Sequence, residues 1–482
     1  MIRTPIRLAA AVLLMTTATL VAAEPADGPP HRVVILTDIK ADPDDEQSLI
    51  RLLLYSNEID IEALVATTST HRRHDPAADA IRDMLATYGD VHGNLLLHDE
   101  RYPSEEALLS LVKTGSPEYG MAGVGRGKDT EGSDEIIRIL QLDDPRPVWV
   151  SVWGGANTLA QALFRIRDEF PTDEAKRLVA KLRVYTISDQ DDSGPWIRRE
   201  FPDLFYIVSP GDYGRATWTA FTRGFPGFGD YISNQWLADN VQQDHGPLGA
   251  KYPDVAWGVE GDTPAYLALI PNGLSVPDRP DWGGWGGRYE LYQPTDTEIG
   301  VGGTAPGNVA IEPETRPIWT NAVDRFTPWV RTEFGRSIGP VDATYESQHV
   351  TLLRWRDDIQ RDFAARMDWT IRPYAETNHP PIVELVTASE LTAMSGQGLY
   401  VDASKSRDPD GDSLTYHWFN YAEAGTLDET VDMGWAVNQP GVWFHLPEVS
   451  KAESLHFIVR VTDRGEPALS RYARVIVTVQ PD

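Results

Sequence analysis

Four aspartates stand close together where the first predicted strand gives way to a helix: Asp38, Asp42, Asp44 and Asp45. The apolar run 33–36 before them is typical of a buried strand, and open α/β sheets bind ligands beyond the carboxyl ends of such strands. Like charges this close repel one another, and a hard cation with oxygen ligands, such as Ca²⁺, would hold them together. One acid is enough to cap a helix, so four favour a metal or substrate site over capping alone.

Two later segments add candidate oxygen ligands. Asp262 stands two residues before a proline that suits a first helical turn. It is therefore either an acid at a helix N-terminus or a further carboxylate of the same site. Asn157 follows a Gly-Gly pair after the apolar run 148–152. It either caps the next helix or turns its backbone carbonyl toward the metal, since glycines allow a close approach of the backbone.

An acidic loop after another predicted strand offers groups that suit a sugar. It runs from Ser188 to Trp196 and contains Asp189, Asp191 and Asp192. Its carboxylates could accept hydrogen bonds from hydroxyl groups, and its tryptophan could stack on a sugar ring. A solvated surface loop explains the same composition equally well.

The composition argues against several classes of function. The chain has 482 residues, with 72 acids against 43 bases and a formal charge of −29. Such a charge argues against a general nucleic-acid binder and against adsorption to anionic membranes. His71 and His74 lack companions at ligand spacing, so zinc is disfavoured. We find no nucleophile elbow, phosphate-binding loop or dinucleotide fingerprint.

The N-terminal residues 1–23 have the pattern of a signal peptide. Arg3 and Arg7 precede an apolar stretch, and small residues at 22–23 suit cleavage. The stretch is short for a membrane span, and no later segment is apolar enough for one. The chain contains no cysteine, so no disulfide stabilises it. We expect an exported protein, periplasmic or secreted, that does not span a membrane.

The pattern of the chain predicts two domains. From 31 to 375, apolar strands alternate with amphipathic helical segments, which is typical of an α/β fold with an open, mostly parallel sheet flanked by helices. Glycine, proline and tryptophan are dense at 277–289, which favours an ordered loop or lid over a linker. After a boundary near 376–381, short alternating strands over 380–482 predict a small all-β, Ig-like sandwich.

Two features of the predicted sandwich have open interpretations. The acidic segment 408–412 lacks the other ligands of an EF-hand, so we interpret it as a tight turn, with an ion site as the weaker alternative. The aromatic residues Tyr416, Trp418, Trp435 and Trp443 belong to the core, or in part to a sugar-stacking patch.

The acidic motif resembles the signature of the nucleoside hydrolases, a strand ending in Asp-Thr-Asp-Pro-Gly-x-Asp-Asp. Thr37-Asp38 and Asp44-Asp45 match its Thr-Asp and Asp-Asp, with two extra residues between them. The resemblance implies that Asp38 is the catalytic base, which activates water, and that Asp44 faces the sugar. The Ca²⁺ ligands that it implies are Asp38, Asp45, Asn157 (through its backbone carbonyl) and Asp262.

The chain departs from that family beside the last ligand. Nucleoside hydrolases usually have a histidine there, which helps to protonate the leaving base, whereas this chain has Gly261 before Asp262. The resemblance therefore implies that the metal site is kept and that the acid for the leaving group is lost or lies elsewhere. The acidic loop 188–196 is one place where it could lie.

A closer resemblance is to a bacterial exported family of cellulose-binding proteins, which join a nucleoside hydrolase-like domain to a C-terminal sandwich. The stretches that carry it are 44–49, 127–133, 259–264 and 282–289. It implies an exported calcium-dependent hydrolase of N- or O-glycosyl bonds in a carbohydrate or nucleoside-like substrate. The alternative is a non-catalytic protein that binds carbohydrate, such as cellulose. The residues that we expect to contact substrate are Asp44, Trp153, Asp189, Asp192, Trp196 and Glu260.

Overall fold

An eight-stranded sheet forms the centre of the larger domain. The computed structural model describes residues 28–331, 337–340, 342–427 and 429–482, so the predicted signal peptide lies outside the described residues. The strand order is β3-β2-β1-β4-β5-β6-β10-β7, and only β7 runs antiparallel to its neighbour. The strands are β1 (His31–Thr37), β2 (Ile59–Ala66), β3 (Val112–Thr114), β4 (Val148–Val152), β5 (Leu182–Thr186), β6 (Phe205–Val208), β7 (Tyr289–Tyr292) and β10 (Ile318–Asn321).

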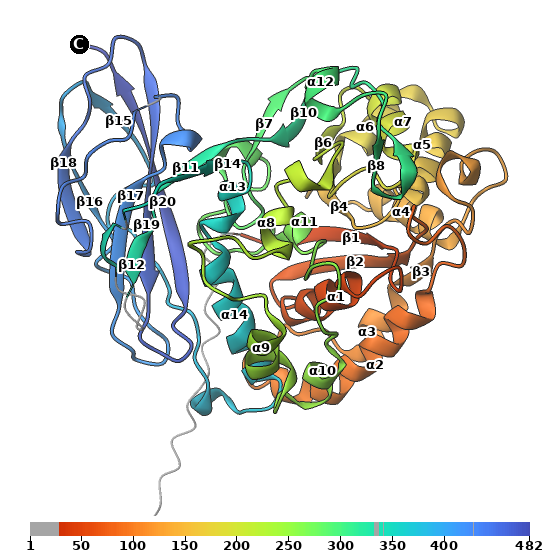
Figure 1. Ribbon diagram of the computed structural model, residues 1–482, viewed down its shortest axis with the longest axis horizontal. Helices are drawn as coiled ribbons and strands as arrows, with labels where there is room; N and C mark the ends of the chain where they lie inside the picture. Colours follow the sequence, from red (N-terminus) through yellow and green to blue (C-terminus); the bar gives the residue numbers. More distant parts are fainter. Residues whose placement is uncertain (1–27, 332–336, 341, 428) are drawn as a thin grey trace, which may run out of the picture.

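Helices cover both faces of this sheet (Figure 1). Successive side chains of a strand point to opposite faces. In β1, Val33 and Ile35 therefore join one buried cluster, and Val34 and Leu36 join the other. The first cluster includes side chains of α1 (Asp44–Leu54) and α2 (Ala78–Leu95), and the second includes side chains of α4 (Glu131–Gln141) and α5 (Asn157–Glu169). The predicted α/β fold is confirmed.

The remaining elements of the larger domain are mostly short. The helices are α3 (Glu105–Ser110), α6 (Thr172–Ala180), α7 (Ser193–Glu200), α8 (Thr219–Thr222), α9 (Asn234–Leu237), α10 (Gly246–Lys251), α11 (Pro264–Leu267), α12 (Asp296–Ile299), α13 (Val350–Leu353) and α14 (Arg356–Trp369). The further short strands are β8 (Thr304–Ala305), β9 (Val309–Ala310), β11 (Asp324–Phe326), β12 (Trp329–Arg331), β13 (Ser337–Pro340) and β14 (Tyr345–Ser347). Among them, β12 lies against the sandwich, where its Trp329 contacts the core (Figure 1). In the described part of the chain, no helix has the length and apolarity that a bilayer span requires.

The C-terminal strands form the predicted all-β domain. One sheet has the order β15-β20-β19-β17, and β16 pairs with β18 in the other. The strands are β15 (Glu390–Met394), β16 (Gly398–Asp402), β17 (Thr415–Asn420), β18 (Gly441–His445), β19 (Glu453–Thr462) and β20 (Ser470–Gln480). Trp418 is fully buried in the core between the sheets, whereas Trp435 and Trp443 are exposed. Residues 408–412 form a turn in which Asp408 accepts the backbone N–H groups of Asp410 and Asp412.

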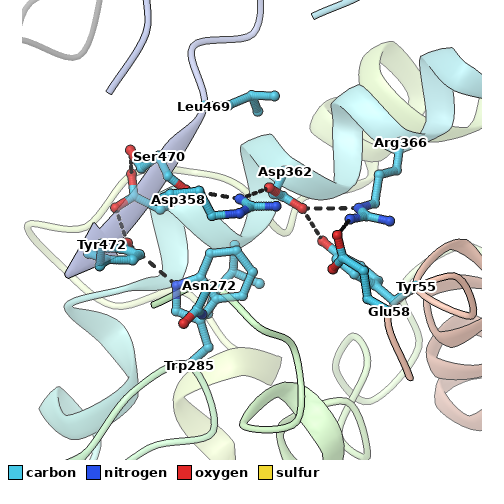
Figure 2. Close-up of polar contacts among 12 residues, drawn as sticks. Tyr55, Glu58, Asn272, Trp285, Asp358, Asp362, Arg366, Leu469, Ser470 and Tyr472 are labelled. Carbon is cyan, nitrogen blue, oxygen red and sulfur yellow. Dashed lines mark hydrogen bonds and ion pairs between the residues drawn. The ribbon is translucent and has the colours of Figure 1, made fainter. Parts of the chain in front are cut away.

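Charged and aromatic contacts join the two domains (Figure 2). On β20, Tyr472 and Ser470 donate hydrogen bonds to Asp358 of α14. Arg471 pairs with Asp362, one helical turn further along. The predicted ordered loop 277–289 belongs to this contact, because its Trp285 is fully buried and its Nε1 lies 3.4 Å from the Tyr472 hydroxyl.

Candidate metal centre

The four predicted aspartates lie in and around the loop between β1 and α1. Carboxylate oxygens of Asp42, Asp44 and Asp45 lie within 4.8 Å of one another. Among the described residues, this is the one group of three or more acids, histidines or cysteines with ligand atoms so close. Asp38 follows the last residue of β1 and is 3% exposed. The loop and the first turn of α1 therefore bring Asp42, Asp44 and Asp45 together, and Asp38 lies near them but outside this group.

Asp262, more than 200 residues further along the chain, lies near these acids but outside the group whose ligand atoms are within 4.8 Å of one another. It lies just before α11, it is 2% exposed, and its Oδ2 is buried with no hydrogen-bond partner. Burial raises the pKa of Asp262 well above its usual value, and the negative charges of Asp44, Asp45 and Asp38 raise it further. Gly261 permits the approach, because a Cβ there would lie 2.6 Å from Oδ2 of Asp44.

The electrostatics of the cluster suit a bound cation. Burial raises the pKa of Asp38 to about 7, against a hydrogen bond that the Ser69 hydroxyl donates to its Oδ2. Burial and neighbouring carboxylates also raise the pKa values of Asp44 and Asp45 well above the usual range. Buried carboxylates that repel one another supply hard oxygen donors, and one of them has an unused oxygen. This donor set fits a divalent cation such as Ca²⁺.

Glycines and an amide shape the loop after β4 around the cluster. A Cβ at Gly154 would lie 2.6 Å from Oδ1 of Asp38, so this position leaves no room for a side chain. The side chain of Asn157 accepts a hydrogen bond from Thr67 and donates to Thr68 and to the backbone carbonyl of Glu118. Its amide thus ties the loop after β2 to α5. The role of its own carbonyl as a ligand stays a prediction.

Two of the expected substrate contacts have protein partners instead. Glu260 is fully buried and forms an ion pair with Arg51, and it also accepts hydrogen bonds from Tyr252 and Thr263. Trp153 is fully buried and packs on Tyr266 with ring centroids 5.9 Å apart. Neither side chain has a free face for a ligand, so their positions give no support to the predicted contacts.

The acidic loop after β5 is also partly engaged. Asp189 forms two hydrogen bonds of 2.8 Å with Arg198, and Asp192 accepts the backbone N–H of Met121 at 2.7 Å. Trp196 packs on Phe201 and under the guanidinium of Arg167, among helices. In this structure these groups stabilise the loop and α7. Of the substrate-contacting residues that the sequence suggested, Asp44 is the one that lies within the acidic cluster.

Sequence reasoning offered Asp191 only as one of three acids of this loop, with Asp189 and Asp192, that could protonate a leaving group. Asp191 is 1% exposed; its Oδ1 accepts the Ser193 N–H, while its Oδ2 is buried without a partner. That oxygen lies beside Gly155, where a Cβ would be 2.4 Å away. Burial raises the pKa of Asp191 to about 6. The loop 188–196 signalled the region, but only the fold shows which of its acids keeps a free oxygen.

Sequence reasoning also missed Tyr213, an aromatic residue near the acidic cluster. The Tyr213 hydroxyl lies 3.4 Å from Nε2 of His71, and the Tyr213 ring packs on Trp218 with centroids 5.3 Å apart. Burial and the charges of Asp38 and Asp262 raise the pKa of Tyr213. The sequence places His71 and Tyr213 far apart, and no local motif links them.

A cavity lies away from these acids, between the two domains. Its volume is about 1070 Å³, and its lining includes Phe228, Trp355 and Phe419 from both domains. None of the acids of the cluster lines this cavity.

Two family models match this chain. The nucleoside hydrolase-like domain of cellulose-binding Sde182 matches residues 32–289, and the C-terminal domain of cellulose-binding protein Sde0182 matches 398–479. No curated protein matches.

Solved structures give a similar result. A nucleoside hydrolase-related hypothetical protein from Saccharophagus degradans, associated with carbohydrate metabolism, is 32% identical with a TM-score of 0.76; the match covers 94% of this chain and 100% of that one. The effector protein XOO4466 is 11% identical with a TM-score of 0.28, over 47% of this chain and 65% of its own, which is too little likeness for an argument. Since a family model matches more than half of the chain, this protein belongs to the Sde182 family of cellulose-binding proteins with a nucleoside hydrolase-like domain.

Proposed function

We propose that this chain is an exported, calcium-dependent hydrolase of glycosyl bonds that acts on a carbohydrate or nucleoside-like substrate. The observation that carries the proposal is the burial of Asp262 beside Asp38, Asp44 and Asp45, with one oxygen that no protein group uses. The family is described as cellulose-binding, which supports a carbohydrate partner. The signal-like pattern of residues 1–23 supports export to the periplasm or the medium.

We assign a separate chemical role to each residue of the site. Asp38, Asp45 and Asp262, with the Asn157 carbonyl, would hold the ion. Bound there, Ca²⁺ would supply positive charge that keeps these carboxylates ionised and orients hydroxyl groups of the substrate. Asp38 accepts the proton of the attacking water, which then adds to an anomeric carbon with oxocarbenium character. Asp44 accepts a hydrogen bond from a sugar hydroxyl.

The leaving group needs a proton from another residue, because Gly261 has no side chain to supply one. We assign this task to Asp191, whose pKa of about 6 keeps part of its population protonated near neutral pH. Asp189 is less suited, because Arg198 engages both of its oxygens. Asp192 is less suited because it is exposed, so burial does not favour its protonated form.

A turnover assay with matched variants tests the proposal. The full chain, stripped with chelator, is incubated with nucleosides, aryl glycosides and cello-oligosaccharides, with and without Ca²⁺. We expect release of reducing sugar or base that requires Ca²⁺, and loss of that release in Asp38→Asn. Asp79→Asn is the control, because the Asp79 side chain is 98% exposed on α2. No turnover on any substrate by a calcium-loaded chain would contradict the proposal.

The second candidate function is carbohydrate binding without turnover, favoured by Gly261 beside the last carboxylate. It predicts that Asp38→Ala keeps the affinity for glycan and that no turnover appears in the wild-type chain. Retention of the chain on insoluble cellulose and other polysaccharides measures this. A chain that binds neither polysaccharide nor sugar would exclude it.

A further inference from the structure

Two large aromatic side chains are exposed side by side on the outer face of the smaller sheet of the sandwich. Tyr400 on β16 and Trp443 on β18 are direct partners across the antiparallel pair. Their exposed fractions are 54% and 57%. Their neighbours along each strand point inward: Val401, Val442 and Phe444 are buried in the core. The two rings therefore stand on a rigid, well-packed support.

Each ring lies close to a glycine of the neighbouring strand. A Cβ at Gly398 would lie 2.5 Å from Cζ2 of Trp443 and 3.1 Å from its Cε2. A Cβ at Gly441 would lie 2.1 Å from the Tyr400 hydroxyl oxygen and 2.6 Å from its Cζ. A side chain at either glycine would lift the ring from the strand. The two glycines thus leave room for the rings beside the backbone, and more than half of each residue stays exposed.

Polar groups border this pair of rings. Strand alternation places His445 and Asp402 on the same face as Trp443 and Tyr400. The His445 ring packs edge-on against Trp443, with centroids 4.4 Å apart. These groups can bond with hydroxyls at the margin of a ligand that covers the rings.

We propose that Tyr400 and Trp443 form a binding platform for a neutral polysaccharide with flat pyranose rings, of the β-linked glucan type. The inference rests on the carbohydrate partner of the proposed function and assigns it a second site, on the other domain from the acids. Aromatic faces bury large apolar area against the C–H faces of a sugar, while bordering polar groups set its orientation. The chain's charge of −29 disfavours anionic polymers and lipid surfaces at this face.

Retention of the full chain on insoluble cellulose, as a function of its concentration, tests the platform. We expect Trp443→Ala and Tyr400→Ala each to weaken retention by roughly tenfold. Gly398→Val keeps the tryptophan but lifts its ring, and we expect a similar loss. Trp435→Ala is the control: Trp435 is 90% exposed on the same domain and lies in a turn outside the strands β16 and β18.

The outcomes separate this inference from the function proposed for the acids. Calcium binding and turnover of small glycosides should be unchanged in all four variants, which also shows that they fold. The platform is excluded if the Trp443→Ala, Tyr400→Ala double variant retains wild-type binding, or if Trp435→Ala loses as much. It is also excluded if the wild-type chain binds no neutral glucan, or if the variants change self-association instead.

Discussion

The buried acids of the α/β domain and the exposed aromatic rings of the sandwich differ in the kind of ligand that each would stabilise. At the acids, carboxylates are removed from water beside like charges, so a cation is required to stabilise their charged forms. On the sandwich, apolar faces are left in water on a strongly packed sheet, so a ligand that covers them gains hydrophobic free energy. Under the proposed function, the acids would position a reaction and the aromatic rings would hold a large substrate nearby.

Glu260 offers the sharpest contrast to the acidic cluster, because it is a buried acid that has its counter-charge. Removing one partner of a buried ion pair leaves the other charge uncompensated. We expect Glu260→Gln to lower the free energy of unfolding by about 3–5 kcal/mol, since Arg51 would lose its carboxylate. In calcium-free buffer, Asp262→Asn should instead leave stability unchanged or raise it. Chemical denaturation of both variants measures the difference, and equal destabilisation would contradict the contrast.

The pH dependence of stability tests the same point without mutation. The pKa of Asp38 is raised to about 7, so between about pH 4 and 7 the native chain binds more protons than the unfolded chain. The calcium-free protein should therefore lose stability as pH rises through this range, by up to about 4 kcal/mol from this group. Added Ca²⁺ should raise the melting temperature more at pH 8 than at pH 5. A calcium effect that is equal at both values would count against ionised acids as ligands.

Gly154 tests how closely the loop after β4 encloses the cluster. A methyl group there would meet Oδ1, Cβ and Cγ of Asp38 within 2.8 Å. We expect Gly154→Ala to weaken calcium binding by about tenfold, because the carboxylate must move. Gly93→Ala is the control, since a Cβ at Gly93 has no neighbour within 4 Å. Unchanged calcium affinity in Gly154→Ala would show that Asp38 is not a ligand.

Trp196 should give the smallest effect. Its ring packs on Phe201 and near Arg167, away from the outward-facing rings of the sandwich. We expect Trp196→Ala to change affinity for calcium and for sugar by less than about twofold, as for a side chain outside both sites. Titration with each ligand checks this. A large loss of sugar affinity would restore the stacking role that the sequence suggested.

Much of the fold and the acidic cluster of the site could be predicted from the sequence. The strand runs at 33–36 and 148–152 are apolar because both faces of the sheet are covered, and such runs are readable without a structure. Asp42, Asp44 and Asp45 are neighbours in the chain, so their proximity needs no long-range information. The approach of Asp262 followed from the resemblance of the chain to a family.

What the sequence could not show concerns groups whose partners are distant or depend on fine geometry. Glu260 looks like a free acid until the fold brings Arg51 to it from 209 positions away. In the acidic loop, Arg198 engages both oxygens of Asp189, whereas Asp191 bonds with Ser193 through Oδ1 and keeps Oδ2 without a partner. Trp443 and Trp418 have similar neighbours in the sequence. Only the folded sheets show that the Trp418 ring lies in the core and that the Trp443 ring lies outside it.

Calcium titration into the chelator-treated full chain tests the central claim most directly. By calorimetry at pH 7.5, we predict one calcium site in the wild-type chain and in Asp79→Asn, and an affinity at least about 100-fold lower in Asp262→Asn. If Asp262→Asn binds calcium as the wild-type chain does, or if the wild-type chain binds none, the metal centre built from these acids is wrong.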